Sequence, residues 1–332
     1  MTGALSGPVG AAQAGLGQAD PALADPALTG PAPAGAGLVG AELARPVDPR
    51  VRDMAAAVAG RHADAARAVL FYGSCLREKQ LDGLMLDFYL IVSDYSAAYD
   101  RRWLAVANRL IPPNVFPMEH EGLTAKYAVL SEADFARLCG QGADNVSVWA
   151  RFAQPARLVW TADEAAREAV IAAVAQAAPT LLALALPVVA EKRRGDWRSL
   201  FEAGFAKTYG AELRAERKGR SLSILDNAPD YYQALFDAAV RDGAVSPART
   251  IAPGEQAANA KRWRRLQRRG KYLSIVRLMK ASFTFTGGID YLAWKINRHA
   301  GTQIIITPWQ RRHPLLAAFM LLPRLVANRA VG

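Results

Sequence analysis

The stretch Phe71–Tyr95, FYGSCLREKQLDGLMLDFYLIVSDY, decides the fold that we expect for this chain. It contains the end of an apolar run, ARAVLFY, then the dipeptide Gly73-Ser74, and after a short loop a second apolar run, LMLDFYLIV. Both runs are rich in branched and aromatic residues, which predicts two buried strands. The second run carries a single acidic residue, Asp87. Because an unpaired carboxylate is costly to bury, Asp87 is expected to face a metal ion or a cleft.

Gly73, Ser74 and Asp87 together indicate a phosphate-binding site. A glycine lets the backbone approach a triphosphate closely, and the serine hydroxyl and nearby amides can bind its oxygens. A carboxylate on the neighbouring strand can then hold Mg²⁺ against those phosphates. This layout resembles the nucleotidyltransferase fold, in which a second carboxylate usually follows two residues later. Here that position is Tyr89, and the nearest alternative is Asp94, which is equally typical of a solvated strand end.

Outward from this stretch the chain divides into four segments. Residues 1–47 are rich in Ala, Gly and Pro, which predicts a disordered leader. Residues 48–162 have a mixed α/β pattern and form the predicted nucleotidyltransferase domain. Residues 163–258 predict a helical domain, and residues 259–332 a basic, partly apolar segment. We therefore expect an α+β fold: a nucleotidyltransferase-fold mixed sheet flanked by helices, then a mostly helical domain and a basic C-terminal helical segment.

One stretch of the predicted helical domain, Ala169–Ala190, carries no charge and is long enough to raise the question of a membrane span. It contains Pro179 and Pro187, and much of the rest is alanine. We expect two helices of a globular domain, broken at the prolines.

Composition excludes several classes of protein. The chain has 332 residues, of which 52% are hydrophobic and 21% charged, as in folded globular proteins. Two cysteines are too few for a disulfide scaffold or a four-cysteine metal site, and four histidines without the HExxH spacing disfavour a zinc enzyme. The net charge of +11 is uneven, because residues 261–332 hold 15 Lys and Arg against Asp290 alone. That local excess indicates an anionic partner, either nucleic acid or lipid headgroups.

Further motifs follow in order along the chain, among them RRWLAVANRLIPPNVF from residue 101, LTAKYAVLS from 123, ARFAQPARLVW from 150, RRGDWRSLF from 193 and SIVRLMKASFTFTGGIDYLAWKINR from 274. Together with FYGSC and LDFYLIVSD, they resemble the mitochondrial translocator assembly and maintenance protein family, the mitochondrial-type phosphatidate cytidylyltransferases. Asp87 and Asp94 match its acidic positions. Trp103, Asn108, Asn114, Lys126, Tyr127, Arg151 and Pro155 match further motif positions. The likeness runs from residue 68 to residue 298, with departures at Cys75, Leu104 and Ala150.

The resemblance implies transfer of CMP from CTP to phosphatidic acid, with Mg²⁺ as cofactor, giving CDP-diacylglycerol and pyrophosphate. Carried over by position, it implies that Gly73 and Ser74 cradle the triphosphate and that Lys126 neutralises phosphate charge. Asp87 and Asp94 would be the Mg²⁺ ligands. Two further residues, Asp196 and Arg198, would close the nucleotide site from the helical domain. The departures indicate a distant, bacterial member, cytoplasmic and peripheral on the inner face of the cell membrane.

The basic segment is expected to dock on an anionic membrane surface, because its cations lie beside aromatic residues and precede an apolar run at 314–325. The predicted membrane-binding residues are Lys261, Arg262, Trp263, Arg264, Arg265, Arg268 and Arg269. The apolar run is too short to span a bilayer, and whether it lies in the interface or packs on the protein stays open.

Two alternative functions remain at the level of the sequence. One is a nucleotidyltransferase acting on RNA, a small molecule or a protein; nucleic acid is disfavoured because no aromatic-rich platform is evident. The other is a catalytically inactive, membrane-associated nucleotidyltransferase-like module, for which Tyr89 and Cys75 are the best support.

Overall fold

The computed structural model describes residues 34–78, 80–211, 224–284, 297 and 305–312. The strands are β1 Ala66–Tyr72, β2 Met85–Val92, β3 Asn114–His120, β4 Leu123–Ser131 and β5 Ala156–Thr161. The α-helices are α1 Ala34–Leu43, α2 Pro49–Gly60, α3 Tyr95–Ala98, α4 Arg102–Leu110, α5 Glu132–Cys139, α6 Trp149–Phe152, α7 Glu164–Ala175, α8 Ala177–Ala185, α9 Trp197–Tyr209, α11 Pro229–Arg241, α12 Pro253–Thr284 and α14 Pro308–Arg312. Short 3-10 turns are η3 Ala63–Ala65, η4 Ser74–Arg77, η5 Leu186–Val188 and η6 Glu191–Arg193.

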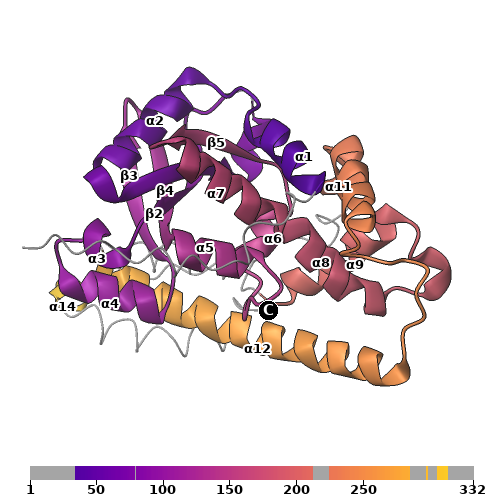
Figure 1. Ribbon diagram of the computed structural model, residues 1–332. Helices are drawn as coiled ribbons and strands as arrows, with labels where there is room; N and C mark the ends of the chain where they lie inside the picture. Colours follow the sequence, from indigo (N-terminus) through magenta and orange to yellow (C-terminus); the bar gives the residue numbers. More distant parts are fainter. Residues whose placement is uncertain (1–33, 79, 212–223, 285–296, 298–304, 313–332) are drawn as a thin grey trace, which may run out of the picture. The chain divides into compact units, whose positions relative to one another are not determined.

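The five strands form one mixed sheet in the order β3-β4-β2-β1-β5. The central pair β2 and β4 is parallel, and the other neighbours are antiparallel. Helices cover both faces of this sheet, as Figure 1 shows. The α+β class with a mixed sheet flanked by helices, expected from the sequence, is therefore confirmed.

Alternation along the strands builds two apolar cores. In β2, Phe88 and Leu90 point to the face covered by α2, α3 and α4, while Tyr89 and Ile91 point to the face covered by α5 to α8. Because both faces of β2 are covered, its sequence is an almost continuous apolar run. Asp87 is the exception, and it lies near the start of the strand.

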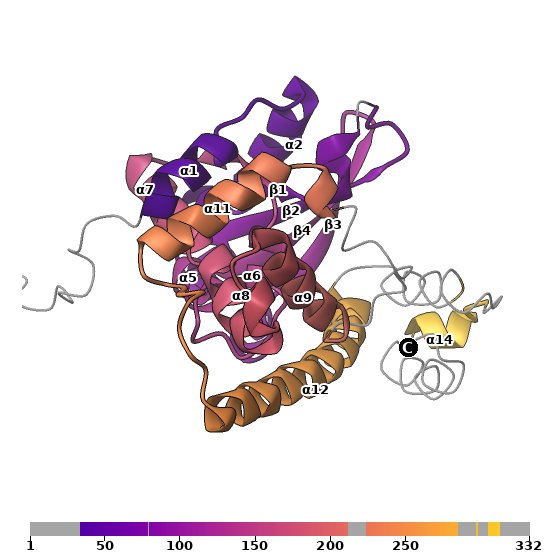
Figure 2. The ribbon, with the colours of Figure 1, turned by 90° about the vertical axis from the view of Figure 1, so that its right-hand side faces the viewer.

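The prediction of a disordered leader is wrong for residues 34–47, because residues 34–43 form helix α1. Val39 and Leu43 are each 2% exposed, and the buried carboxylate of Glu42 accepts a hydrogen bond from Arg157 Nη1 at 2.7 Å. Figure 2 shows α1 beside α11, which is remote in the sequence. Glycines give this segment a weak intrinsic helix preference, so tertiary packing stabilises it. Residues 1–33 of the predicted leader lie outside the described residues.

The stretch forms two helices, α7 and α8, as expected, but the break between them lies at Gln176 and not at a proline. The chain bends at Gln176, and Pro179 lies in the first turn of α8, where its missing N–H costs little. Among the described residues, Glu164–Val188 is long and apolar enough to cross a membrane. Its most apolar window is 67% buried inside the protein, as in the core helices of globular proteins.

The predicted boundary between residues 162 and 163 does not separate two cores. Side chains of the sheet and of α5 and α6, such as Ile91 and Trp149, belong to the same apolar cluster as Leu181 in α8, Phe201 in α9 and Tyr232 in α11. One of the two apolar cores is therefore shared by the sheet and these helices, where the sequence predicted separate domains. The predicted boundary at residue 259 is also displaced. Helix α12, which carries the start of the basic segment, begins at Pro253, and its Trp263 and Leu266 belong to the same core.

The end of α12 is attached to the segment between α4 and β3. Arg277 donates from Nε to Pro112 O at 2.7 Å, and Lys280 Nζ donates to Ile111 O and, at 2.9 Å, to Pro113 O. Burial lowers the pKa of the Lys280 ammonium to about 7, and the nearby charge of Arg277 acts in the same direction. A buried cation at this contact therefore titrates near neutral pH.

The depressed pKa of Lys280 predicts a pH-dependent free energy of unfolding. Between about pH 7 and its ordinary value of 10.5, the unfolded chain keeps the proton that the folded chain has lost, so Lys280 makes stability rise with pH in this window. For one proton the slope is at most about 1.4 kcal/mol per pH unit. Denaturant unfolding measured across this window should show that Lys280→Met has lost this pH dependence of the free energy of unfolding. The control Lys261→Met, which changes an exposed cation of the same helix, should keep it. Equal slopes in both variants would contradict the assignment.

Candidate functional site

Three polar side chains form a row across the middle of the sheet. Tyr72 of β1 is in register with Asp87 of β2, and Asp87 is in register with Lys126 of β4. Lys126 Nζ lies 3.1 Å from Asp87 Oδ1, and the two side chains are 39% and 22% exposed. All three lie on the face covered by α5 to α8. The pair is thus accessible to a ligand, and Lys126 supplies the cation that compensates the Asp87 carboxylate.

Gly73 forms the turn next to this row. Its φ of 96° and ψ of −164° are open to glycine and strained for other residues. A Cβ at this position would lie 3.3 Å from Asp87 Oδ2. The backbone therefore passes close to the carboxylate, and Ser74 follows as an exposed residue of η4.

Cys75, which departs from the family's motif, turns away from the row. Its thiol is 7% exposed and belongs to the core on the opposite face of the sheet. Sγ donates to Met85 O at 3.5 Å, and burial raises the pKa of the thiol. A ligand at the row can therefore contact only the backbone of Cys75. The side chain packs in the core on the other face of the sheet.

Gly73→Ala is expected to destabilise the turn by about 1–3 kcal/mol, because alanine is strained at this backbone conformation. The added methyl group also reaches Asp87, so nucleotide binding should weaken. Thermal unfolding and equilibrium titration with nucleotide measure the two effects. Gly142→Ala is the matched control, since a Cβ there meets nothing within 4 Å. Unchanged nucleotide affinity in Gly73→Ala would contradict a role for this turn.

Asp94 does not join Asp87, so the expectation that the two share a Mg²⁺ ion is wrong. It lies seven residues further on, beyond the other end of β2, about 20 Å away along the extended chain. There it caps the N-terminus of α3, accepting from Ser96 N at 2.7 Å, and it pairs with Arg109 at 3.4 Å. The hydrogen bonds from Ser96 hold the pKa of Asp94 below its ordinary value. A structural cap explains this residue.

Asp196 and Arg198 also have structural partners. Asp196 caps α9, accepting from Ser199 N at 3.1 Å, and the hydrogen bond from the Ser199 side chain is the main cause of its lowered pKa. Arg198 pairs with Asp226 at 2.8 Å and stacks over Trp197. Both residues therefore have a structural role, and their contacts to a nucleotide stay a prediction.

The row can supply one carboxylate ligand, that of Asp87, to a magnesium ion. Among the described residues, no cluster of three His, Cys, Asp or Glu side chains is placed to hold a metal. Mg²⁺ is commonly bound by one or two carboxylates, with substrate phosphates and waters as its other ligands. Asp87 can be such a single carboxylate. The residues present therefore fit Mg²⁺ that arrives with a nucleotide.

The predicted membrane-binding residues divide into two groups. Trp263 is buried at 2% exposure, and its Nε1 donates to Leu184 O at 3.0 Å, so the expectation that it inserts into a membrane is wrong. Arg262 donates to Gln141 O, and Arg269 pairs with Asp144 at 2.5 Å. All six cations of this set are exposed, and four of them have no hydrogen-bond or ion-pair partner in the described part of the chain: Lys261, Arg264, Arg265 and Arg268. The apolar run at 314–325 lies outside the described residues.

Tyr72 is the residue of this site that the sequence reasoning missed. It is half-buried, and its ring lies 5.2 Å from that of Tyr89 and 5.9 Å from that of Phe152. Its position directly before Gly73, in a strand that alternates between two faces, was the available signal.

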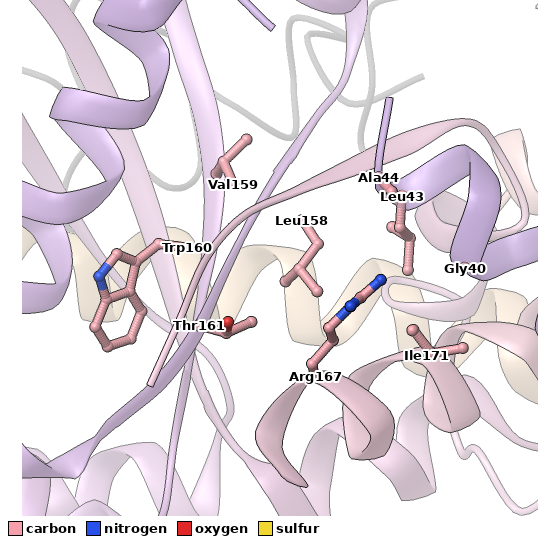
Figure 3. A pocket seen from close by; sticks show the side chains of 9 residues that line it. All are labelled: Gly40, Leu43, Ala44, Leu158, Val159, Trp160, Thr161, Arg167 and Ile171. Carbon is pink, nitrogen blue, oxygen red and sulfur yellow. The ribbon is translucent and has the colours of Figure 1, made fainter. Parts of the chain in front are cut away.

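A cavity of about 240 Å³ lies elsewhere, between α1, β5 and α7 (Figure 3). Leu43, Leu158 and Ile171 form apolar walls, and the guanidinium of Arg167 reaches across it. Gly73, Asp87 and Lys126 do not line this cavity. It is therefore separate from the row of polar side chains.

Comparison with known proteins gives little further guidance. No protein-family model and no curated protein matches the chain. Among solved structures, a nucleotidyltransferase-like protein from Exiguobacterium sibiricum matches over 83% of this chain and 91% of its own, with 9% sequence identity and a TM-score of 0.27. A likeness this distant carries no argument about activity, so the function rests on the residues themselves.

Proposed function

We propose that this chain is a nucleotidyltransferase that transfers CMP from CTP to phosphatidic acid, giving CDP-diacylglycerol and pyrophosphate. The observation that carries the proposal is the accessible Asp87–Lys126 pair, 3.1 Å apart, beside the glycine turn at Gly73. These groups support nucleotidyl transfer in general. The choice of CTP and phosphatidic acid comes from the ordered motif likeness between residues 68 and 298.

Nucleotidyl transfer requires positioning and charge neutralisation more than covalent catalysis. In this proposal the amides of the Gly73–Ser74 turn and the Ser74 hydroxyl bind phosphate oxygens. Lys126 is flexible and partly exposed, so its ammonium can move from Asp87 to a phosphate oxygen. Mg²⁺, when bound, would neutralise triphosphate charge, with Asp87 as its protein ligand. These residues thereby hold the nucleotide with its α-phosphorus open to attack.

The bond changes are those of a single displacement. An oxygen of the phosphatidate phosphate forms a bond to the α-phosphorus of CTP. The bond from that phosphorus to the oxygen bridging to the β-phosphate breaks, and pyrophosphate leaves with the electron pair. In this scheme the described side chains bind and orient, and none forms a covalent intermediate.

A lipid acceptor requires access to a membrane, so the proposal includes peripheral binding to an anionic surface, on the inner face of a bacterial cell membrane. Lys261, Arg264, Arg265 and Arg268 are exposed along one side of α12 and support this part of the proposal. Each cation near an anionic surface contributes about 1 kcal/mol.

The direct test incubates the purified chain with Mg²⁺, phosphatidate vesicles and each of the four nucleoside triphosphates in turn. CDP-lipid and pyrophosphate should form with CTP and not with the other three. Parallel reactions replace the vesicles with RNA. Label transferred to RNA and not to lipid would overturn the choice of acceptor, and no pyrophosphate release under any condition would overturn nucleotidyl transfer.

A further inference from the structure

Helix α4 exposes an apolar stripe that the proposed reaction does not use. Trp103, Val106 and Leu110 are 45%, 53% and 74% exposed. Their spacing of three and four residues places them on one side of the helix. Large apolar side chains gathered on one exposed surface are typical of an interaction site.

The stripe faces outward because the opposite side of α4 is fixed to the protein by hydrogen bonds of two buried asparagine side chains. Asn108 is fully buried, and its Nδ2 donates to Val129 O at 2.9 Å. Its Oδ1 accepts from Asn114 N, and Asn114 Nδ2 donates to Leu104 O at 3.1 Å. Two of the three motif positions in this segment thus have a structural role. The third, Trp103, has no hydrogen bond or ring contact to any residue that the structure describes.

Cations lie at both ends of this apolar stripe. Arg101 and Arg102 at the start of α4 are exposed, and Arg109 near its end pairs with Asp94, whose side chain is 50% exposed. Lys280 and Arg277 attach α12 to the segment that directly follows α4. Elsewhere on α12, five exposed cations have no ionic partner within the described ranges: Lys261, Arg264, Arg265, Arg268 and Lys271. Apolar side chains framed by cations are complementary to the surface of an anionic bilayer.

We propose that α4 is a docking helix for an anionic lipid bilayer. Trp103, Val106 and Leu110 enter the boundary between headgroups and acyl chains, and Arg101 and Arg102 bind lipid phosphates. The choice of a bilayer as occupant rests on the lipid acceptor of the proposed function. Because α4 packs on the face of the sheet opposite Asp87 and Lys126, the helix tethers the protein and forms no part of the acceptor site.

The first test is flotation of the full chain with vesicles of phosphatidylcholine, with and without phosphatidylglycerol. The triple variant Trp103→Ser/Val106→Ser/Leu110→Ser should bind anionic vesicles about 10-fold less tightly or worse, since each buried CH₂ contributes about 0.8 kcal/mol. The control Val188→Ser/Val240→Ser changes residues that are 40% and 37% exposed elsewhere, and it should bind as the unaltered chain does. Undiminished binding of the triple variant, or no binding by the unaltered chain, would overturn the proposal.

The second test does not depend on a loss of binding. Both cysteines outside the designed position, Cys75 and Cys139, are buried, so Leu110→Cys can be labelled selectively with an environment-sensitive fluorophore. Its emission should shift to the blue on anionic vesicles, whereas the label at Val240→Cys should not respond. A blue shift that appears without vesicles and grows with protein concentration would mean that the stripe contacts a second copy of the chain, and would overturn the bilayer.

Turnover of detergent-dispersed, short-chain phosphatidate tests the proposed reaction without requiring a bilayer, so it distinguishes a failure of the reaction from a failure of docking by α4. The triple variant should keep that turnover because α4 is remote from the row. Docking without turnover in the unaltered chain would contradict only the reaction, and turnover without docking would contradict only the role of α4.

Discussion

Asp87→Asn is expected to lower kcat/KM for nucleotidyl transfer by about 10³-fold or more. Asparagine keeps the size of the side chain and removes the charge that would hold Mg²⁺ and that now holds Lys126 at 3.1 Å. Because both partners are partly exposed, their ion pair contributes at most about 1 kcal/mol to stability. Thermal unfolding should therefore change little while pyrophosphate release is lost.

Asp94→Asn is the matched control, because it is the same substitution just beyond the other end of β2. Asparagine can still cap α3, so the variant loses mainly the exposed ion pair with Arg109 and should cost less than about 1 kcal/mol of stability without a comparable loss of turnover. Near-normal turnover in Asp87→Asn would contradict the proposed role of Asp87 as a Mg²⁺ ligand. A loss in Asp94→Asn as large as in Asp87→Asn would contradict the separation of the two carboxylates.

Trp263→Ala is expected to destabilise the protein by about 3–5 kcal/mol, as large-to-small changes at buried aromatic residues do. Trp263 is 2% exposed, and its ring lies 6.3 Å from that of Trp149 in an edge-on arrangement. Its replacement leaves a cavity between α12 and α6 and removes the shorter of two hydrogen bonds to Leu184 O, which still accepts from Asn259 Nδ2 at 3.3 Å. The melting temperature should fall by roughly 10 °C.

Tyr272→Ala on the same helix is the control, since Tyr272 is 66% exposed. Its expected effect on stability is within about 0.5 kcal/mol. If Trp263→Ala melts like the unaltered chain and instead loses binding to anionic vesicles, Trp263 would be a membrane residue after all. This comparison decides between the role expected from the sequence and the one seen in the fold.

The parts of the sheet that the sequence predicts are those with strong apolar runs. β2 and β4 are central strands with both faces covered, so LMLDFYLIV and LTAKYAVLS read directly as strands. β3 and β5 are the edge strands. β3 contains Pro117, Glu119 and His120, and β5 is only partly buried along most of its length. Edge strands need no continuous apolar run, so their pattern was too weak to predict them.

The centre of the site was predictable, and its periphery was not. Gly73 and Asp87 come together because consecutive strands usually pair, which the sequence suggests by itself. Asp94 and Asp196 were assigned from the motif likeness. Each is followed within three residues by a serine whose backbone N–H it accepts from, which is the pattern of an N-cap. That signal was available and pointed to helix starts.

The shared core has a consequence for how the protein can vary. Because α8, α9 and α11 rest on the same apolar cluster as one face of the sheet, the sheet and these helices are expected to unfold as one cooperative unit. Neither could be exchanged for a counterpart in a relative without repacking the other. A destabilising substitution in the core of these helices would then lower activity at Asp87 by reducing the fraction of folded molecules, although the substituted residue does not contact the site.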